Sequence, residues 1–355
     1  MNPKPLFPLF FIIAFLNLSN LIWPLNDTDA IKQTRFSVIT NFGIEEAKSE
    51  KERPYQFSSI LSADCDTDGK IYVLDYKDVC VKVFDRNGRF LRKIFRAGQG
   101  PDEIENPYRI KVHRARKHVL VLHKNGFQIK EFDDLGNFVR SHSLPGQTYG
   151  YYDFISENCL LFVASGRFGE KEFNNFKIFN LDTQKIEREF APTTRDYFTS
   201  FQRFIVKDGI VWTCPGDFME LEAYDLKTGV KRKTIALPEK YIPFRVLKWQ
   251  RGGQGIQKLR LSNYAQPFLL GQELYVFVTR QKFALENPNT PNTLDRPLER
   301  SVKVYRFENE RLIEVPGFPS FNFYVDFLAS CQNRIVISSS FYDAFPQIVI
   351  LEIQN

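Results

Sequence analysis

Four charged residues are the best candidates for chemistry, because each opens a short segment rich in β-branched and aromatic residues: Arg109, Asp153, Arg203 and Asp326. Arginine and aspartate in such positions can pair with one another or orient a small polar ligand. Buried charges need partners whatever the function, so the favoured interpretation is an ion-pair network with Arg109 and Arg203 on either side of Asp153. The two aspartates also offer oxygen ligands to a divalent cation, but no third acid stands at an equivalent position. The sequence therefore predicts no metal site.

A second group of candidates lies in the longest polar segment, Pro238–Ala265. It contains one acid, Glu239, against six basic residues, and four aromatic residues lie among them: Lys240, Arg245, Lys248, Arg251, Lys258, Arg260, Tyr241, Phe244, Trp249 and Tyr264. Basic and aromatic side chains together suit an anionic, glycan or peptide ligand. Tyr241, Trp249 and Arg251 are the candidate ligand-binding residues here. The alternative is a solvated loop whose aromatic residues pack on the scaffold.

No catalytic signature accompanies these candidates. The chain contains no GxSxG elbow, no HExxH and no phosphate-binding loop. The segment GQGPDE (98–103) resembles a glycine-rich phosphate loop but lacks the Lys-Ser/Thr and the following helix. It is interpreted as a turn, in which Gly98 and Gly100 permit unusual backbone angles and Pro101 fixes the next. We predict no catalytic residue and no cofactor.

Composition narrows the class of protein further. The 355 residues are 43% hydrophobic and 15% aromatic, with only two methionines, and they can bury a sizeable core of β structure. The net charge of +6 is a mild basic balance that does not predict nucleic-acid binding, because basic clusters are more often a solvated face. The partner is expected to be a protein, a peptide, a glycan or a small anionic ligand, bound by a monomer.

The N-terminus has the pattern of an export signal. Lys4 precedes the apolar run Leu6–Leu16, which suits a signal peptide and is short for a membrane span. No small-x-small cleavage pattern follows, so an uncleaved anchor over Leu6–Leu25 stays open. We expect residues 1–26 to be a signal peptide or membrane anchor, and the protein to be periplasmic, in the cell envelope or extracellular.

The five cysteines do not form a recognisable framework. Cys65, Cys80, Cys159, Cys214 and Cys331 are odd in number, scattered, and never spaced as CxxC. They are interpreted as single small buried apolar residues rather than as a redox or disulfide system.

The elements that must position the candidates are short strands in a repeat. Residues 71–95 contain three strands in a row, with a tight turn at Asp85–Gly88 before the third. The second-strand pattern recurs six times: IYVLD at 71, VLVLH at 119, LLFVA at 160, IVWTC at 210, LYVFV at 274 and IVISS at 335. The first four units are spaced by about forty to fifty residues, the period of a four-stranded propeller blade.

The last unit lacks a fourth strand. It has strands at 324–329, 334–338 and 347–353, and then the chain ends, whereas Arg35–Phe42 is a lone strand at the other end. An open blade would leave unpaired sheet edges, so the two ends are predicted to pair and close a ring. The prediction is an all-β, six-bladed propeller domain over residues 27–355.

These units resemble NHL-type repeats and the broader six-bladed β-propellers of exported bacterial proteins. The resemblance rests on DTDGKIYVLD (66–75), VKVFDRNGRFLRKI (81–94) and GQGPDEIENP (98–107), and it extends over about residues 35–353. Such propellers include lactonases with a divalent metal held by Glu, Asn and Asp, and amidating lyases with zinc held by histidines from several blades. Here all four histidines fall in the second unit: His113, His118, His123 and His142.

The resemblance implies binding proteins and enzymes alike. Within a blade, the loops joining strands two to three and blade to blade share one face, and every long segment of this chain falls there. Long loops on one rim of a rigid scaffold usually carry binding. We expect a non-catalytic binding propeller that uses this long-loop face. The alternative is a metal-dependent, lactonase-like hydrolase or lyase with its site at the channel mouth.

Overall fold

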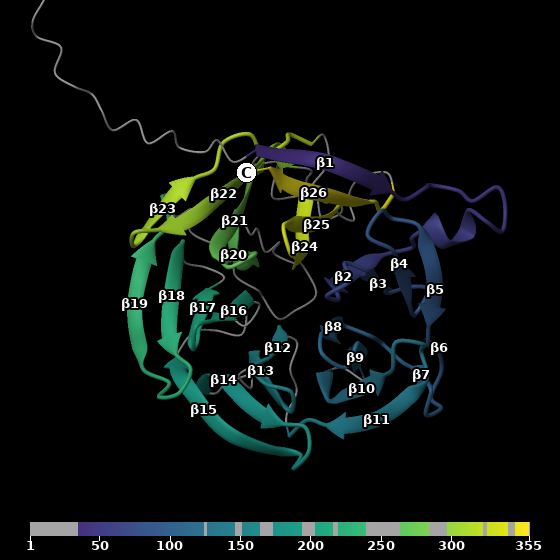
Figure 1. Cartoon of the computed structure of the whole chain (residues 1–355), viewed down its shortest axis with the longest axis horizontal. Coiled ribbons are helices and arrows are strands. Elements are labelled where there is room, and N and C mark those ends of the chain that lie inside the picture. The colour runs from purple at the N-terminus through teal and green to yellow at the C-terminus, as the bar shows by residue number, and fades with distance from the viewer. Residues whose placement is uncertain are drawn as a thin grey trace, which may run out of the picture. The chain divides into compact units, whose positions relative to one another are not determined.

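The fold is a ring of six four-stranded antiparallel sheets (Figure 1). The computed structural model describes residues 35–123, 126–145, 151–163, 173–193, 203–215, 219–238, 263–283, 297–321, 325–339 and 345–354. Apart from the short 3-10 turn η1 (Arg53–Tyr55), the regular elements among them are strands. No helix in these ranges is long and apolar enough to cross a membrane. The predicted all-β propeller with six blades is confirmed.

The blades follow one another along the chain. Blade 1 contains β2 (Ile60–Cys65), β3 (Ile71–Asp75), β4 (Cys80–Phe84) and β5 (Phe90–Ile94). Blade 2 contains β8 (Arg109–His113), β9 (His118–His123), β10 (Gln128–Phe132) and β11 (Phe138–Ser143). Blade 3 contains β12 (Tyr152–Phe154), β13 (Cys159–Val163), β14 (Phe173–Asn180) and β15 (Lys185–Thr193). In each blade the first strand named is the innermost.

The remaining blades complete the ring. Blade 4 contains β16 (Arg203–Lys207), β17 (Ile210–Cys214), β18 (Glu220–Asp225) and β19 (Lys231–Ala236). Blade 5 contains β20 (Asn263–Leu270), β21 (Glu273–Phe283), β22 (Pro297–Glu308) and β23 (Arg311–Glu314). Blade 6 contains β24 (Val325–Cys331), β25 (Arg334–Ser339) and β26 (Ile348–Gln354), and its outer strand is β1 (Arg35–Phe42).

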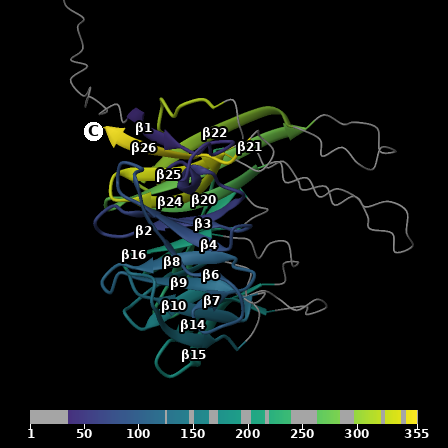
Figure 2. The ribbon, with the colours of Figure 1, turned by 90° about the vertical axis from the view of Figure 1, so that its right-hand side faces the viewer.

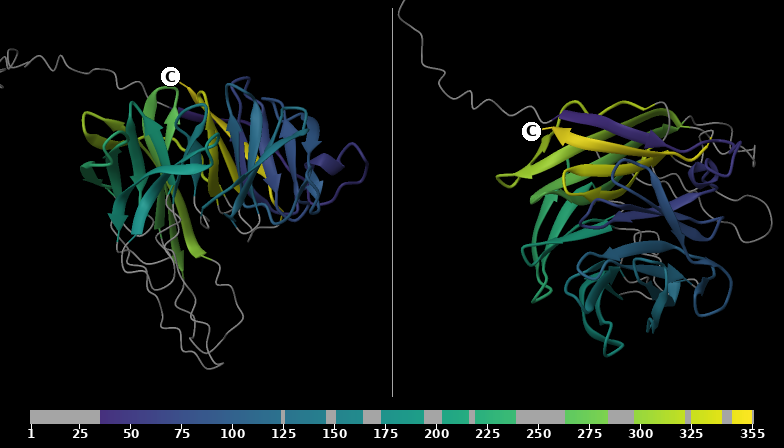
Figure 3. Two further views of the ribbon diagram at one scale, coloured as in Figure 1. Left: turned by 90° about the horizontal axis from the view of Figure 1, so that it is seen from below. Right: turned by 45° about the vertical axis from the view of Figure 1, so that its right-hand side comes forward.

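The two ends of the described chain close the ring, as predicted. β1 pairs antiparallel with β26 from Arg35 opposite Gln354 to Phe42 opposite Ile348. Figures 2 and 3 show the purple β1 lying along the yellow β26. The pairing gives blade 6 its fourth strand and leaves the sheet edge of β26 satisfied.

The hydrophobic core is divided among the seams between blades. Each of six buried clusters combines side chains of two neighbouring blades. At the closing seam, for example, Val73 of blade 1 packs with Val336 and Ile350 of blade 6, all with no exposed surface. Such packing explains why the strands have apolar residues on both faces, the pattern that the sequence shows at IYVLD and VLVLH.

Cations also fasten successive blades together. A basic residue of the outer strand reaches the turn of the next blade: Arg92 to Asp134 O, Arg140 to Asp182, Arg188 to Leu226 O and Lys227 O, and Lys233 to Glu310. We call these four contacts the interblade clasps. In each, a β-bulge lies one residue before the cation. A bulge bends the strand and redirects a side chain, which turns the cation toward the next blade.

The segment between blades 1 and 2 is the turn predicted for GQGPDE. Its short strands β6 (Arg96–Ala97) and β7 (Glu103–Ile104) pair in parallel, and the Glu103 carboxylate accepts a 2.9 Å hydrogen bond from Gly100 N. Gly98 has φ +151°, a backbone conformation that residues with a Cβ rarely adopt. Glycine is therefore the residue that suits this turn.

Candidate functional site

The inner ends of the blades bring most of the predicted charged residues to the central channel. Arg109 is the first residue of β8 and Arg203 is the first of β16, as expected. Asp153 is the second residue of β12 and Asp326 is the second of β24. Tyr241, Trp249 and Arg251 lie in 239–262, outside the described residues, so that part of the predicted site stays a prediction.

Arg109 and Arg203 meet at an aromatic ring rather than at a carboxylate. Their guanidinium carbons lie over the ring of Tyr151, at 3.5 Å and 4.3 Å from its centroid. Tyr151 directly precedes β12 and is half-buried. Cations over the face of a tyrosine are attracted by its ring quadrupole, more strongly when they are partly desolvated.

Arg203 also reaches a third blade. Its Nη1 donates a hydrogen bond to the carbonyl oxygen of Phe327 in β24, and its guanidinium carbon lies 5.9 Å from the centroid of the Phe327 ring. In β24 the pairing register shifts between Phe327 and Ala329, next to this carbonyl. Side chains of blades 2, 3 and 4 thus join blade 6 in one layer, which we call the Arg-Tyr layer: Arg109, Tyr151, Arg203 and Phe327.

Asp153 pairs with a different cation from the one expected. Lys111 Nζ lies 3.0 Å from Asp153 Oδ2 and 3.3 Å from Asp64 Oδ2, so the network runs Asp64–Lys111–Asp153. The predicted network with Asp153 between two arginines is therefore wrong. Alternate residues of β8 face the same neighbour, so Lys111 reaches blade 3 two residues after Arg109. Lysine at this position was the signal that sequence reasoning missed.

The Lys111 network is well satisfied. Asp64 Oδ2 also accepts a 2.8 Å hydrogen bond from Val112 N, on the inner edge of β8. Burial alone would lower the pKa of Lys111, but the Asp153 and Asp64 carboxylates outweigh it and raise that pKa above its usual value. Lys111 is thus protonated at neutral pH and belongs to an ion-pair network between blades.

Arg109 differs from Lys111 because no acceptor among the described residues serves its guanidinium. Among the described residues it has neither an ion pair nor a side-chain hydrogen bond, only the contact with Tyr151. Loss of water around it lowers the pKa of Arg109 to about 10, which leaves it charged at neutral pH. A partly desolvated cation without an acceptor attracts an anionic group.

The described residues do not bring together a metal site. They contain no group of three or more His, Cys, Asp or Glu side chains that could hold an ion. Asp153, one of the two carboxylates considered for this role, already has a lysine ammonium at ligand distance. The histidines lie in blade 2 as expected, where His118 Nδ1 and His142 Nε2 both contact the buried Glu131, at 2.7 Å and 3.2 Å.

The prediction that all five cysteines are unpaired is wrong for two of them. Cys65 and Cys331 form a disulfide with a Cα–Cα distance of 5.9 Å, whereas Cys80, Cys159 and Cys214 are free. The pair joins the innermost strands of blades 1 and 6. It was not apparent from spacing because the residues are 266 positions apart and meet only when the ring closes.

These features define a six-bladed propeller with cationic side chains at its channel. The chain belongs to the family described as a domain of unknown function (DUF4934), whose model matches residues 66–247. No protein of curated function matches the sequence significantly.

Several solved structures share the fold. A Bacteroides fragilis protein described as exported has 12% identity and a TM-score of 0.58, over 93% of this chain and 98% of its own. A member of the DUF4221 family from Bacteroides vulgatus has 13% identity and a TM-score of 0.57, over 91% and 99%. Virginiamycin B lyase from Staphylococcus aureus has 12% identity and a TM-score of 0.49, over 90% and 99%. At these identities the likeness shows the fold alone.

Proposed function

We propose that this protein is a non-catalytic binding propeller of the cell envelope, which holds an anionic group of a small ligand, glycan or peptide at Arg109. The observation that carries the proposal is the half-buried Arg109 guanidinium, which lies over Tyr151 without any described acceptor. An entering carboxylate or phosphate would supply that acceptor, and the Tyr151 ring offers a face to an adjoining sugar or aromatic group.

The long-loop end of the channel is the proposed entrance. Arg109 and Arg203 are the first residues of their strands, directly after the segments that cross between blades on that face. Leu61, the residue at the register shift in the innermost strand β2, is 40% exposed and adds apolar surface to an inner strand. Tyr241, Trp249 and Arg251 of the long loop remain proposed contributors to the same ligand.

Export of the protein is part of this proposal. It is supported by the Lys4–Leu16 pattern and by the Cys65–Cys331 disulfide, since disulfides persist in oxidising compartments. Similar structures include a protein described as exported. The relationship to NHL-type repeats, the assignment of residues 1–26 to a signal peptide or membrane anchor, and the monomeric state are proposed with it.

Binding measurements on the intact protein test the proposed site. A panel of small aromatic acids, acidic peptides and carboxylated glycans, with benzoate as the first probe, would be titrated against the wild type and Arg109→Gln. Loss of a charge-assisted hydrogen bond should weaken binding about tenfold or more. Arg114→Gln is the matched control, because Arg114 is exposed in the turn after the same strand. Equal affinity of Arg109→Gln and Arg114→Gln would refute the site.

A further inference from the structure

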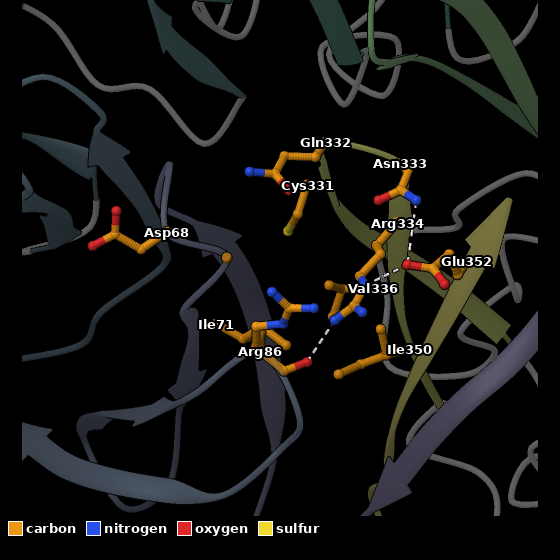
Figure 4. Close-up of a pocket in the computed structure, with 11 residues that line it drawn as sticks. Asp68, Ile71, Arg86, Cys331, Gln332, Asn333, Arg334, Val336, Ile350 and Glu352 are labelled. Carbon is orange, nitrogen blue, oxygen red and sulfur yellow. Dashed lines mark hydrogen bonds and ion pairs between the residues drawn. The ribbon is translucent and has the colours of Figure 1, made fainter.

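A cavity lies on the face opposite the long loops, at the seam where the ring closes (Figure 4). Its volume is about 250 Å³. Its apolar base is made by Ile71, Val336 and Ile350, which are at most 2% exposed. Its polar wall is formed by two guanidinium groups and two amides, those of Arg86, Arg334, Gln332 and Asn333.

The carboxylates at this cavity already have cationic or amide partners. Arg334 Nε lies 3.0 Å from Glu352 Oε1, which also accepts a 3.2 Å hydrogen bond from Asn333 Nδ2. Asp68 lies 2.8 Å from Lys117 Nζ, and the hydrogen bond from Lys117 lowers the pKa of Asp68. Neither acid therefore remains to neutralise a further cation.

Arg86 is the cation that remains. Its guanidinium has no ion pair and no hydrogen bond to any described residue, and Figure 4 shows it directed into the cavity toward the side where Arg334 lies. Its position is fixed through its backbone, because Arg334 Nη1 donates a 2.7 Å hydrogen bond to Arg86 O. Two guanidinium groups that line one small polar cavity form a suitable setting for an oxyanion.

The closing seam differs from the four clasped seams in where its cation comes from. The clasps of blades 1 to 4 come from outer strands, whereas residues 36–42 of the outer strand of blade 6 include no basic residue. Arg334, from β25, makes the equivalent contact with the turn of blade 1 instead. The cation therefore approaches from an inner position, beside the cavity.

We propose that this seam cavity binds a small oxyanion, the carboxylate, sulfate or phosphate group of a small molecule, between Arg86 and Arg334. Arg86 contributes the uncommitted charge and Arg334 contributes its remaining N–H donors, whereas the amides of Asn333 and Gln332 already donate to Glu352 and to Thr67 O. The site is separate from the channel and does not depend on the function proposed for Arg109.

Calorimetric titration of the full-length protein with acetate, sulfate and inorganic phosphate, each at constant ionic strength, tests this site. Wild type should bind at least one of the three saturably, and Arg86→Gln should bind that probe about tenfold or more weakly. Arg89→Gln is the matched control, since Arg89 is exposed on the same turn but does not line the cavity. Arg109→Gln should keep this binding, which separates the seam cavity from the channel.

Asn333→Asp gives an independent variant, because it places a carboxylate at the rim while leaving Arg86 intact. It should weaken the same probe, and the three probes together show which oxyanion fits best. Unchanged affinity in both Arg86→Gln and Asn333→Asp, or no saturable binding of any probe by the wild type, would overturn the proposal.

Discussion

Cys65 and Cys331 are bonded to each other although 266 positions separate them in the chain. They lie at corresponding ends of β2 and β24, the innermost strands of the first and last blades. The β1–β26 pairing closes the ring at its outer side, and the disulfide fastens the same seam at its inner side. The seam between the first and last blades is thus held both by backbone hydrogen bonds and by a covalent bond.

Removing this disulfide should destabilise the protein measurably. A cross-link that closes so long a loop restricts the unfolded chain, and we expect Cys65→Ala or Cys331→Ala to cost about 2–5 kcal/mol. The measurement is thermal or denaturant unfolding without reductant. The double variant should resemble either single one, and reductant should lower the wild type to the same level. Cys159→Ser, which changes a free and half-exposed cysteine, is the control and should have little effect.

The interblade clasps should contribute modestly and individually to stability. Arg92→Ala removes the hydrogen bond to Asp134 O and should lower the free energy of unfolding by about 1–2 kcal/mol. Arg89→Ala, on an exposed turn of the same blade, should change it by less than about 0.5 kcal/mol. If both substitutions have the same small effect in urea unfolding, the clasp does not stabilise the seam.

The ring could be predicted from the sequence because the strand and turn patterns of a propeller recur along the chain and depend on neighbouring residues. The missing fourth strand of the last unit and the lone strand at 35–42 were sufficient to predict the β1–β26 pairing. The residues Asp85 and Gly88 marked the turn between the strands now seen as β4 and β5, and Gly88 N donates a hydrogen bond to Asp85 O. Each of these features depends on neighbours in sequence or on the need to satisfy a sheet edge.

The candidate site was predicted only in part because its contacts join different blades. Arg109 and Arg203 were found from their place at strand starts, but their shared partner Tyr151 lies outside a strand and has no periodic signal. The bulges that direct the clasp cations add one residue to a strand. The alternation of apolar and polar residues in the sequence does not reveal this extra residue. The disulfide depends on closure of the whole ring and leaves no local trace.

Lys82 and Asp75 form a buried pair that should be costly to break. Lys82 Nζ lies 2.8 Å from Asp75 Oδ2, both side chains are fully buried, and Lys82 also donates to Gln56 O. Lys82→Met should lower the free energy of unfolding by about 3–5 kcal/mol, because it leaves the Asp75 carboxylate buried without its cation. Lys93→Met, on the outer strand of the same blade, is the comparison in denaturant unfolding. Equal losses of unfolding free energy in Lys82→Met and Lys93→Met would show that the buried pair contributes no more to stability than an exposed lysine does.

Glu131 should make the protein sensitive to acid. Burial alone would raise its pKa, but hydrogen bonds from His142, Arg140 and His118 outweigh burial and hold that pKa well below its usual range. A carboxyl with a lowered folded pKa contributes stability that is present above its unfolded pKa and is lost as the pH falls through the folded one. Stability measured from pH 5 downward should therefore decline less steeply in Glu131→Gln, which should also be less stable than wild type at pH 7. Parallel pH profiles would contradict this role.

Lys111 should have the opposite pH dependence. Its pKa is raised in the folded protein because the Asp153 and Asp64 carboxylates outweigh burial. A raised folded pKa means that the contribution is fully present below the unfolded pKa, near 10.4, and is lost as the pH rises through the folded value. Lys111→Met should therefore remove part of the alkaline loss of stability seen in the wild type above about pH 10.

Asp64 and Asp153, the two acids beside Lys111, should contribute unequally to the free energy of unfolding. The Asp64 side chain is 6% exposed and also accepts the Val112 N–H, whereas the Asp153 side chain is 35% exposed. Solvent screens the Asp153 pair, so Asp153→Asn should cost only about 1 kcal/mol and Asp64→Asn clearly more. Thermal melts of both variants at low and high salt measure the difference, and salt should weaken the Asp153 contribution more. If Asp153→Asn proved the more damaging substitution, Lys111 would depend on Asp153 rather than on the buried Asp64.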